Sequence, residues 1–257
     1  MKLYFFGTCA GTEPMPGRKH TSFAIEKDGE IYWFDAGEGC SYTAHLMGVD
    51  LMSVHNIFIS HTHMDHVGGL ANLLWNIRKI NQRTGKMSGK KINVFIPNKK
   101  TFDGIMQLLK QTEGDFKIDF TICRKGIQDG EIYNQDGFNV TALHNNHLKR
   151  EEDGSWLSFS FLIEAEEKKI VYSGDVGSIS DIDSLIQNCD LLLMETGHHT
   201  VEDVCNYIMD TNKEVGVLGF IHNGRAILAN PERELKKAKD ILGDRVFITE
   251  DGMTMKI

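Results

Sequence analysis

The sequence predicts an α/β fold in which helices cover β-sheets. The first 60 residues are rich in short apolar runs separated by Gly and Pro, a pattern typical of strands. From His66 onward the apolar residues take up helical spacing, and strand and helix patterns then alternate. No Pro-rich linker or low-complexity segment interrupts the 257 residues. We therefore expect a single domain over residues 1–257.

Local patterns define each element in turn. The first expected strands are Lys2–Phe6, Ser22–Glu26, Ile31–Asp35 and Asn56–Ser60, followed by a helix marked by Val67, Leu70, Leu73, Leu74, Ile77 and Ile80. The later strands are Ile92–Ile96, Ile118–Cys123, Phe138–Leu143, Ser158–Ile163, Ile170–Ser173, Leu191–Met194, Val215–Ile221 and Val246–Thr249, and the later helices are Thr101–Leu109, Val201–Met209 and Pro231–Leu242. Val246–Thr249 is expected to form a final hairpin with Met253–Ile257.

The composition is that of a soluble globular protein, with 41% apolar and 25% charged residues. The net charge of −8 argues against a general polyanion-binding surface. No apolar run approaches the roughly 20 residues that span a bilayer, so no membrane partner is expected. The five cysteines are scattered without a CxxC pair, which favours reduced thiols and a cytoplasmic location.

The stretch Ile59–Gly69, with the sequence ISHTHMDHVGG, concentrates strong metal ligands between an apolar run and a helix. On such a turn the side chains of His61, His63, Asp65 and His66 can converge, which neither a strand nor a helix alone would allow. Imidazole and carboxylate groups suit zinc, and also iron or manganese. Because a catalytic zinc usually has three protein ligands and a water, four candidates on one turn suggest two ions.

Further ligand candidates follow later strands. His144 and His147 come after one apolar run, Asp175 after another and His222 after a third, each near Gly or Asn. A lone histidine after a strand is more often a structural or surface residue. The repetition of this order behind the first motif instead favours one shared site.

These residues resemble the ligand pattern of metallo-β-lactamase-fold hydrolases over essentially the whole chain. The match consists of HTHMDH at 61–66, His147, SGD at 173–175 and His222, with DAG upstream at 35–37. The resemblance implies an αββα sandwich with the metals at one edge, and it favours His147 over His144, which would pack beside the site. It implies one ion bound by His61, His63 and His147, a second bound by Asp65, His66 and His222, and Asp175 as the bridge.

Two other segments resemble the branch that contains ribonuclease Z and small phosphodiesterases. They are FGTCAGTEPMPGRKHTS at 6–22 and LMETGHHT at 193–200. The resemblance implies that Glu195 supports the site and that His198 is a general acid or phosphate contact, with His199 as the competing choice. Asp35 is either a support for the ligands or a turn residue. The tRNA-processing members carry a long arm between the third ligand and the bridging Asp, where this chain has only residues 148–174.

The resemblance therefore implies a dinuclear metal-dependent hydrolase, of phosphodiesterase type, that uses a metal-bridging hydroxide whose proton Asp65 accepts. Two divalent ions are expected, zinc first, with manganese or iron as alternatives. The expected partner is a small anionic ester or phosphodiester; nucleic acid is not favoured, and a homodimer is left open. Hydrolysis of a lactone, thioester or other ester is the alternative. An iron-dependent oxidoreductase is disfavoured because such relatives usually carry Glu in place of His63.

Overall fold

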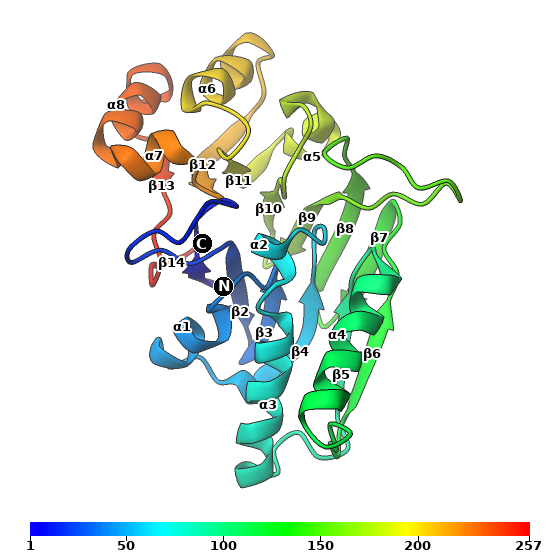
Figure 1. The fold of residues 1–257 in the computed structure, drawn as a ribbon. Coiled ribbons are helices and arrows are strands. Elements are labelled where there is room, and N and C mark those ends of the chain that lie inside the picture. The colour runs from blue at the N-terminus through cyan, green and yellow to red at the C-terminus, as the bar shows by residue number, and fades with distance from the viewer. The chain divides into compact units, whose positions relative to one another are not determined.

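The computed structural model describes residues 1–257, which form two compact units (Figure 1). The first unit consists of Met1–Gly7, Pro14–Ile127 and Asp251–Ile257. The second consists of Thr8–Glu13 and Gln128–Glu250. Both chain termini therefore belong to the first unit, whereas a short segment near the amino terminus is part of the second.

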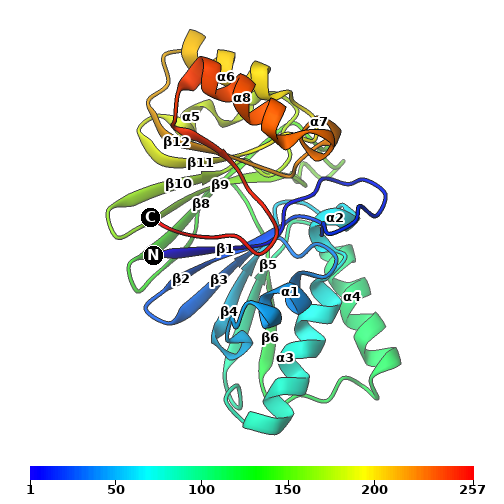
Figure 2. The ribbon, with the colours of Figure 1, turned by 90° about the vertical axis from the view of Figure 1, so that its left-hand side faces the viewer.

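The first unit is built on a seven-stranded mixed sheet with the strand order β14-β1-β2-β3-β4-β5-β6. Its strands are β1 (Lys2–Gly7), β2 (Ser22–Lys27), β3 (Glu30–Phe34), β4 (Val54–Phe58), β5 (Lys91–Phe95), β6 (Thr121–Lys125) and β14 (Thr254–Lys256). Pairing is antiparallel from β14 to β3 and parallel from β3 to β6. Its helical segments are α1 (Cys40–Leu46), η1 (Leu51–Ser53), α2 (Met64–Val67), α3 (Leu70–Thr84) and α4 (Lys99–Thr112). Figure 2 shows α1, α3 and α4 on one face of this sheet.

The helix α3 shows why this face of the sheet is covered. Leu70, Leu73, Leu74 and Ile77 recur at helical spacing, and all four are fully buried in the core of the unit. Full burial of such a side chain contributes about 1.5–3 kcal/mol. The apolar stripe that predicted this helix is therefore the surface that attaches it to the sheet.

The second unit is built on a seven-stranded mixed sheet with the order β13-β12-β11-β10-β9-β8-β7. Its strands are β7 (Gly130–Gln135), β8 (Phe138–His144), β9 (Phe159–Ala165), β10 (Lys168–Tyr172), β11 (Cys189–Glu195), β12 (Val215–Ile221) and β13 (Val246–Ile248). Pairing is antiparallel from β7 to β10 and parallel from β10 to β13. Its helical segments are η2 (Ile179–Ile182), α5 (Asp183–Ile186), α6 (Val201–Asp210), α7 (Arg225–Ala229) and α8 (Pro231–Leu242).

The strand directions place the predicted site residues. In the first unit β3 and β4 are parallel, so the loops with Asp35 and His61–His66 leave the same edge of the sheet. In the second unit β10, β11 and β12 are parallel, and β8 runs with them because β8 and β10 are both antiparallel to β9. The loops that carry His147, Asp175 and His222 therefore also leave one edge. In open α/β sheets, ligands bind beyond the carboxyl ends of the strands.

Most predicted elements are present with bounds that differ by a few residues, but the predicted terminal hairpin is wrong. β13 pairs with β12 and β14 pairs with β1, so the two strands lie in different sheets. Thr249 N donates to Phe220 O, whereas Gly252 N donates to Phe5 O. The turn-forming residues between them mark the point at which the chain leaves one unit for the other. The strand β7 and the helical segments α1, η1, η2, α5 and α7 were not predicted, and α2 forms within the stretch that was predicted as a turn.

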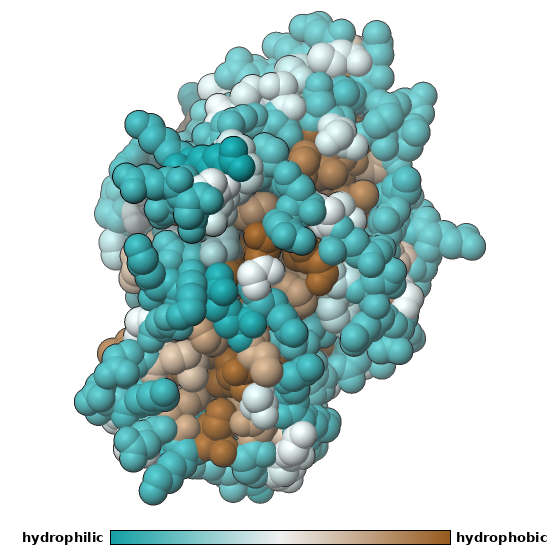
Figure 3. Space-filling model, turned by 90° about the vertical axis from the view of Figure 1, so that its right-hand side faces the viewer, coloured by the Kyte–Doolittle hydropathy of each residue, from teal (hydrophilic) through white to brown (hydrophobic).

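None of the helices combines the length and the apolar character that a membrane-spanning segment requires. The face of the molecule in Figure 3 is mostly hydrophilic, with apolar patches between polar side chains. This distribution agrees with apolar side chains that are mainly buried in the two cores.

The predicted hairpin between positions 158 and 173 is confirmed, and its turn is tight. Ala165 of β9 pairs with Lys168 of β10, which leaves only Glu166 and Glu167 in the turn. Both residues have positive φ angles, 52° and 61°. Two-residue turns of this kind favour Asn-Gly, because a left-handed backbone is unfavourable for a residue such as glutamate.

We predict that the double variant E166N/E167G raises the free energy of unfolding by about 1 kcal/mol, since it relieves two left-handed glutamates. Urea denaturation measures the change. The control variant E166Q/E167Q removes the same charges without relieving the backbone and should leave the midpoint nearly unchanged. A gain in the control as large as in the test variant would contradict the conformational explanation.

Candidate metal centre

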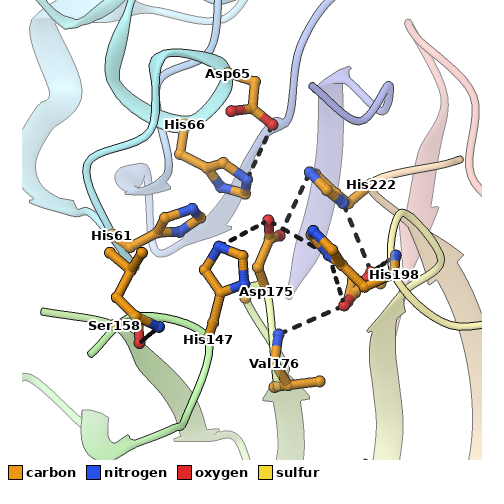
Figure 4. Close-up of polar contacts among 12 residues, drawn as sticks. His61, Asp65, His66, His147, Ser158, Asp175, Val176, His198 and His222 are labelled. Carbon is orange, nitrogen blue, oxygen red and sulfur yellow. Dashed lines mark hydrogen bonds and ion pairs between the residues drawn. The ribbon is translucent and has the colours of Figure 1, made fainter. Parts of the chain in front are cut away.

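The first unit carries four predicted ligands between β4 and α3. His61, Asp65 and His66 are buried, whereas His63 is exposed. The Nε2 atom of His66 lies 3.4 Å from Oδ2 of Asp65 (Figure 4). The ligand atoms of His61 and His63 lie within 4.8 Å of one another. Two ligands of a tetrahedral zinc ion with bonds of about 2.1 Å are roughly 3.4 Å apart, so Asp65 and His66 have the spacing of neighbouring ligands.

Asp35, fully buried after β3, orients two of these histidines. Its Oδ2 lies 2.7 Å from His66 Nδ1 and accepts the Ser60 hydroxyl at 2.7 Å, and its Oδ1 accepts Ser60 N. Ser60 Oγ is also 3.1 Å from His61 Nδ1. An ionised carboxylate only accepts hydrogen bonds, so His66 donates to Asp35 from Nδ1. Ser60 gives its hydroxyl proton to Asp35 and therefore accepts from His61, so the His61 proton is also on Nδ1. The lone pair of each ring is then on Nε2, the nitrogen that can bind a metal.

The loop that carries Asp35 packs directly against the ligand turn. Ala36 N donates to His66 O at 2.6 Å, and Gly69 N donates to Ala36 O at 2.7 Å. A Cβ atom at Gly69 would come within 2.2 Å of Gly37 O, so only glycine permits this approach. Both roles considered for Asp35 are therefore present: it contacts the ligands, and its φ of 50° makes it a turn residue.

The second unit brings together His147, Asp175 and His222. Asp175 and His222 are each 2% exposed. Asp175 Oδ2 lies 3.7 Å from His147 Nε2, and Asp175 Oδ1 lies 3.4 Å from His222 Nε2 (Figure 4). Both separations are long for a hydrogen bond but close to the spacing of neighbouring metal ligands. Each oxygen of one carboxylate thus faces a different imidazole.

The segment Thr8–Glu13 supports the loop that carries His222. Asn223 N donates to Thr8 O at 2.6 Å, and Ala10 N donates to Asn223 O at 3.1 Å. His222 itself has a φ of 51°, an uncommon conformation that surrounding structure must stabilise. The amino-terminal motif therefore has a structural role in the second unit.

Glu195 and His198 form a second pair beside Asp175. The buried Glu195 carboxylate accepts His198 N at 2.9 Å and lies 3.1 Å from His198 Nδ1. Burial alone raises the pKa of Glu195, but the hydrogen bond from His198 and the nearby His222 imidazole, whose Nδ1 is 3.7 Å from Oε2, outweigh it and lower this pKa to about 2. The hydrogen bond to Glu195 in turn raises the pKa of His198. His198 Nδ1 is 3.8 Å from Asp175 Oδ2.

The two alternative histidines have other partners. His199 Nε2 lies 3.2 Å from the carbonyl oxygen of Val176. The His144 ring contacts Asp129 at 2.6 Å and stacks on Trp156, with ring centroids 4.1 Å apart. None of these contacts involves a predicted ligand.

Sequence reasoning missed the two residues that fix the ligand loops from within. Ser60 connects Asp35 to His61, and Asn145 accepts His147 N through Oδ1 at 3.1 Å. Asn145 Nδ2 also donates to Ser160 Oγ at 3.1 Å. Each lies one or two positions before a ligand, and a short polar side chain at a strand end is the signal that could have identified it.

Comparison with known proteins agrees with this fold. The crystal structure of the metallo-β-lactamase fold protein YhfI from Bacillus subtilis has a TM-score of 0.74 and 16% identity, and covers 99% of this chain and 98% of that one. The short form of human tRNase Z also has a TM-score of 0.74, with 19% identity over 100% of this chain and 99% of that one. Ribonuclease Z from Picrophilus torridus is 29% identical over 248 aligned positions, which cover 80% of this chain and 76% of that enzyme.

The fold and the relatives define the class: the protein is a metal-dependent hydrolase with the metallo-β-lactamase fold, so the predicted fold class and resemblance are confirmed. Residues 1–224 match the family model described as anti-Pycsar protein Apyc1. The chain belongs to this family.

The residues present fit divalent cations. Each unit offers imidazole nitrogens and carboxylate oxygens, and Asp35 places the lone pairs of His61 and His66 on Nε2. Nitrogen and oxygen donors of this kind suit zinc, manganese and iron.

We predict that Asp35→Asn lowers metal affinity about 10- to 100-fold, the usual cost of losing a group that orients a ligand. Asparagine tolerates the left-handed backbone but presents an N–H group where His66 needs an acceptor. Competition titration with a chelator measures the affinity. Asp119→Asn is the matched control, since Asp119 accepts from Asn81 in the same unit and contacts no predicted ligand. Equal affinities for Asp35→Asn and the unsubstituted protein would contradict the role of Asp35.

Proposed function

We propose that this protein is a dinuclear metal-dependent phosphodiesterase that acts on a small anionic substrate, with residues 1–257 as one functional domain. The observation that carries the proposal is the orientation of Asp175, whose two carboxylate oxygens face His147 and His222 separately. A carboxylate that binds a single ion needs a neighbouring ligand beside only one of its oxygens. An imidazole beside each oxygen of Asp175 therefore supports two ions. The proposed ligands are His61, His63 and His147 for one ion, Asp65, His66 and His222 for the other, and Asp175 for both.

Divalent ions, with zinc proposed first and manganese or iron as alternatives, would supply Lewis-acid activation of water and stabilise charge on a phosphoryl oxygen. The chain's own residues then have distinct roles. Asp65 accepts the proton of the attacking water. His198 donates a proton to the leaving oxygen, and its raised pKa keeps more of the imidazole protonated near neutral pH. Glu195 holds His198 in place through two contacts.

His198 is a better proton donor than His199 on two grounds. The His198 side chain is 46% exposed, so it can reach a substrate, and it is paired with the ionised Glu195. The His199 side chain is 16% exposed and faces a backbone carbonyl group, and its Nε2 is 3.7 Å from Glu195 Oε1, which is long for a hydrogen bond. A general acid must be accessible to the leaving group.

The short connection between His147 and Asp175 supports a small substrate. Residues 148–174 contain no helix and form only a loop and the tight hairpin of β9 and β10. RNA is the second candidate substrate, because the similar proteins include enzymes named ribonuclease Z.

The substrate class is tested with bis-p-nitrophenyl phosphate, a precursor tRNA, p-nitrophenyl acetate and a lactone, each with metal-loaded protein. The proposal expects the phosphodiester to be hydrolysed fastest. Faster cleavage of the tRNA would select the second candidate, and faster cleavage of the acetate or the lactone would contradict a phosphodiesterase.

We predict that the protein binds about two equivalents of metal and that His61→Ala and Asp175→Ala reduce both metal content and hydrolysis. Asp175→Ala should have the larger effect, because it removes a ligand from both ions. Elemental analysis after dialysis measures the stoichiometry. His144→Ala is the control, a histidine at a strand end that should keep the full metal content. Unchanged stoichiometry in Asp175→Ala would rule out the bridging role.

We also predict that His198→Ala keeps its metal but slows turnover by roughly 10²- to 10⁴-fold for substrates with alkoxide leaving groups. The loss should be much smaller with p-nitrophenolate, which leaves without protonation. His199→Ala provides the comparison and should change either rate little. Equal losses for both kinds of leaving group would exclude His198 as the acid.

A further inference from the structure

We infer that Asp181 is a positioning residue that fixes the separation of the two loops that carry His147 and Asp175. This inference rests on the proposed role of those two residues as metal ligands. Asp181 lies in η2, the short helix that follows the Asp175 loop, and is half-buried. It acts through its hydrogen bonds to the two loops.

The Asp181 carboxylate accepts four hydrogen bonds, two from each loop. From the His147 loop, Asn146 N donates to Oδ2 at 3.0 Å and Asn146 Nδ2 donates to Oδ1 at 2.7 Å. From the Asp175 loop, Gly177 N and Ser178 N each donate to Oδ2 at 3.1 Å. Hydrogen bonds to an ionised acceptor are stronger than neutral ones, so one side chain joins both loops firmly.

The bonded positions are close to the ligands in the chain. Asn146 directly precedes His147, and Gly177 is two residues after Asp175. A Cβ atom at Gly177 would lie 2.7 Å from Asn146 O, so the two loops are in direct backbone contact here. A shift of Asp181 would therefore change the distance between His147 Nε2 and Asp175 Oδ2, which is 3.7 Å.

Helix capping alone does not explain these contacts. Ser178 caps η2 and Asp181 completes a capping box with it, an arrangement that requires only the bond to Ser178 N. The bonds to Asn146 and Gly177 are additional. A buried network joins the loops on the inner side: Asn145 Nδ2 donates to Ser160 Oγ, and Ser160 Oγ donates to Ser173 O at 2.5 Å. Asp181 completes the connection on the outer side.

The test combines cobalt binding with amide hydrogen exchange. Full-length Asp181→Ala and Asp181→Asn proteins are titrated with Co²⁺, whose visible absorption reports affinity and coordination geometry. Exchange at Asn146, Gly177 and Ser178 is measured without metal. Asp181→Ala should weaken Co²⁺ binding about 10- to 100-fold, alter the absorption spectrum and accelerate exchange, with Asp181→Asn intermediate.

Two controls separate positioning from stability. Ser178→Ala removes the cap of η2 but keeps Asp181, and Asp183→Ala loses the contact to Tyr207 without touching either loop. Both should retain the cobalt affinity within about twofold. Unchanged affinity, spectrum and exchange in Asp181→Ala would overturn the inference, as would an equal loss of affinity in the controls. Absence of Co²⁺ binding by the unsubstituted protein, with exchange still dependent on Asp181, would instead overturn the proposed ligand roles.

Discussion

Three fully or almost fully buried carboxylates constrain the candidate ligands of the two units. Asp35 and Glu195 are 0% exposed and Asp175 is 2% exposed. An ionised carboxylate away from water is costly unless charges or hydrogen-bond donors surround it. Each of the three therefore needs cationic or donor groups close by, and in each case histidines supply them. The clustering of imidazoles at the strand ends follows from this requirement as much as from metal binding.

The candidate metal ligands could be proposed from the sequence because their signal is local. HTHMDH at 61–66 concentrates four candidate ligands on one turn, and the later candidates repeat the order of strand, candidate ligand and Gly or Asn. Asp35 was a candidate support in the sequence, but its partner His66 and the role of Ser60 were not predictable, because these hydrogen bonds depend on the parallel pairing of β3 with β4. No periodic pattern in the sequence indicates that β3 pairs with β4.

The prediction of a terminal hairpin was wrong for the same reason, because strand pairing is not a local property of the sequence. Residues 250–252 carry a strong turn signal, and the apolar runs beside them are short enough to form a two-stranded ribbon. The partners of these strands are β12 and β1, more than 20 positions away in the chain in each case. A local pattern specifies that a strand exists but not which neighbour it pairs with. The α8 helix shows the converse: Asn230 caps it and Pro231 begins it, so its bounds agree with the prediction.

In each unit a carboxylate that is not itself a proposed metal ligand orders the proposed ligands. In the first unit Asp35 sets the tautomers of two histidines, and in the second Asp181 bonds to both ligand loops. The two devices differ in chemistry, since one controls which nitrogen carries the lone pair and the other controls a distance. Both reduce the ordering that an ion would have to impose on the side chains, and that reduction favours binding. The metal affinity of the protein therefore depends on the Asp35 and Asp181 carboxylates as well as on the seven proposed ligands. A chain with those seven residues but without the two carboxylates would bind its ions weakly.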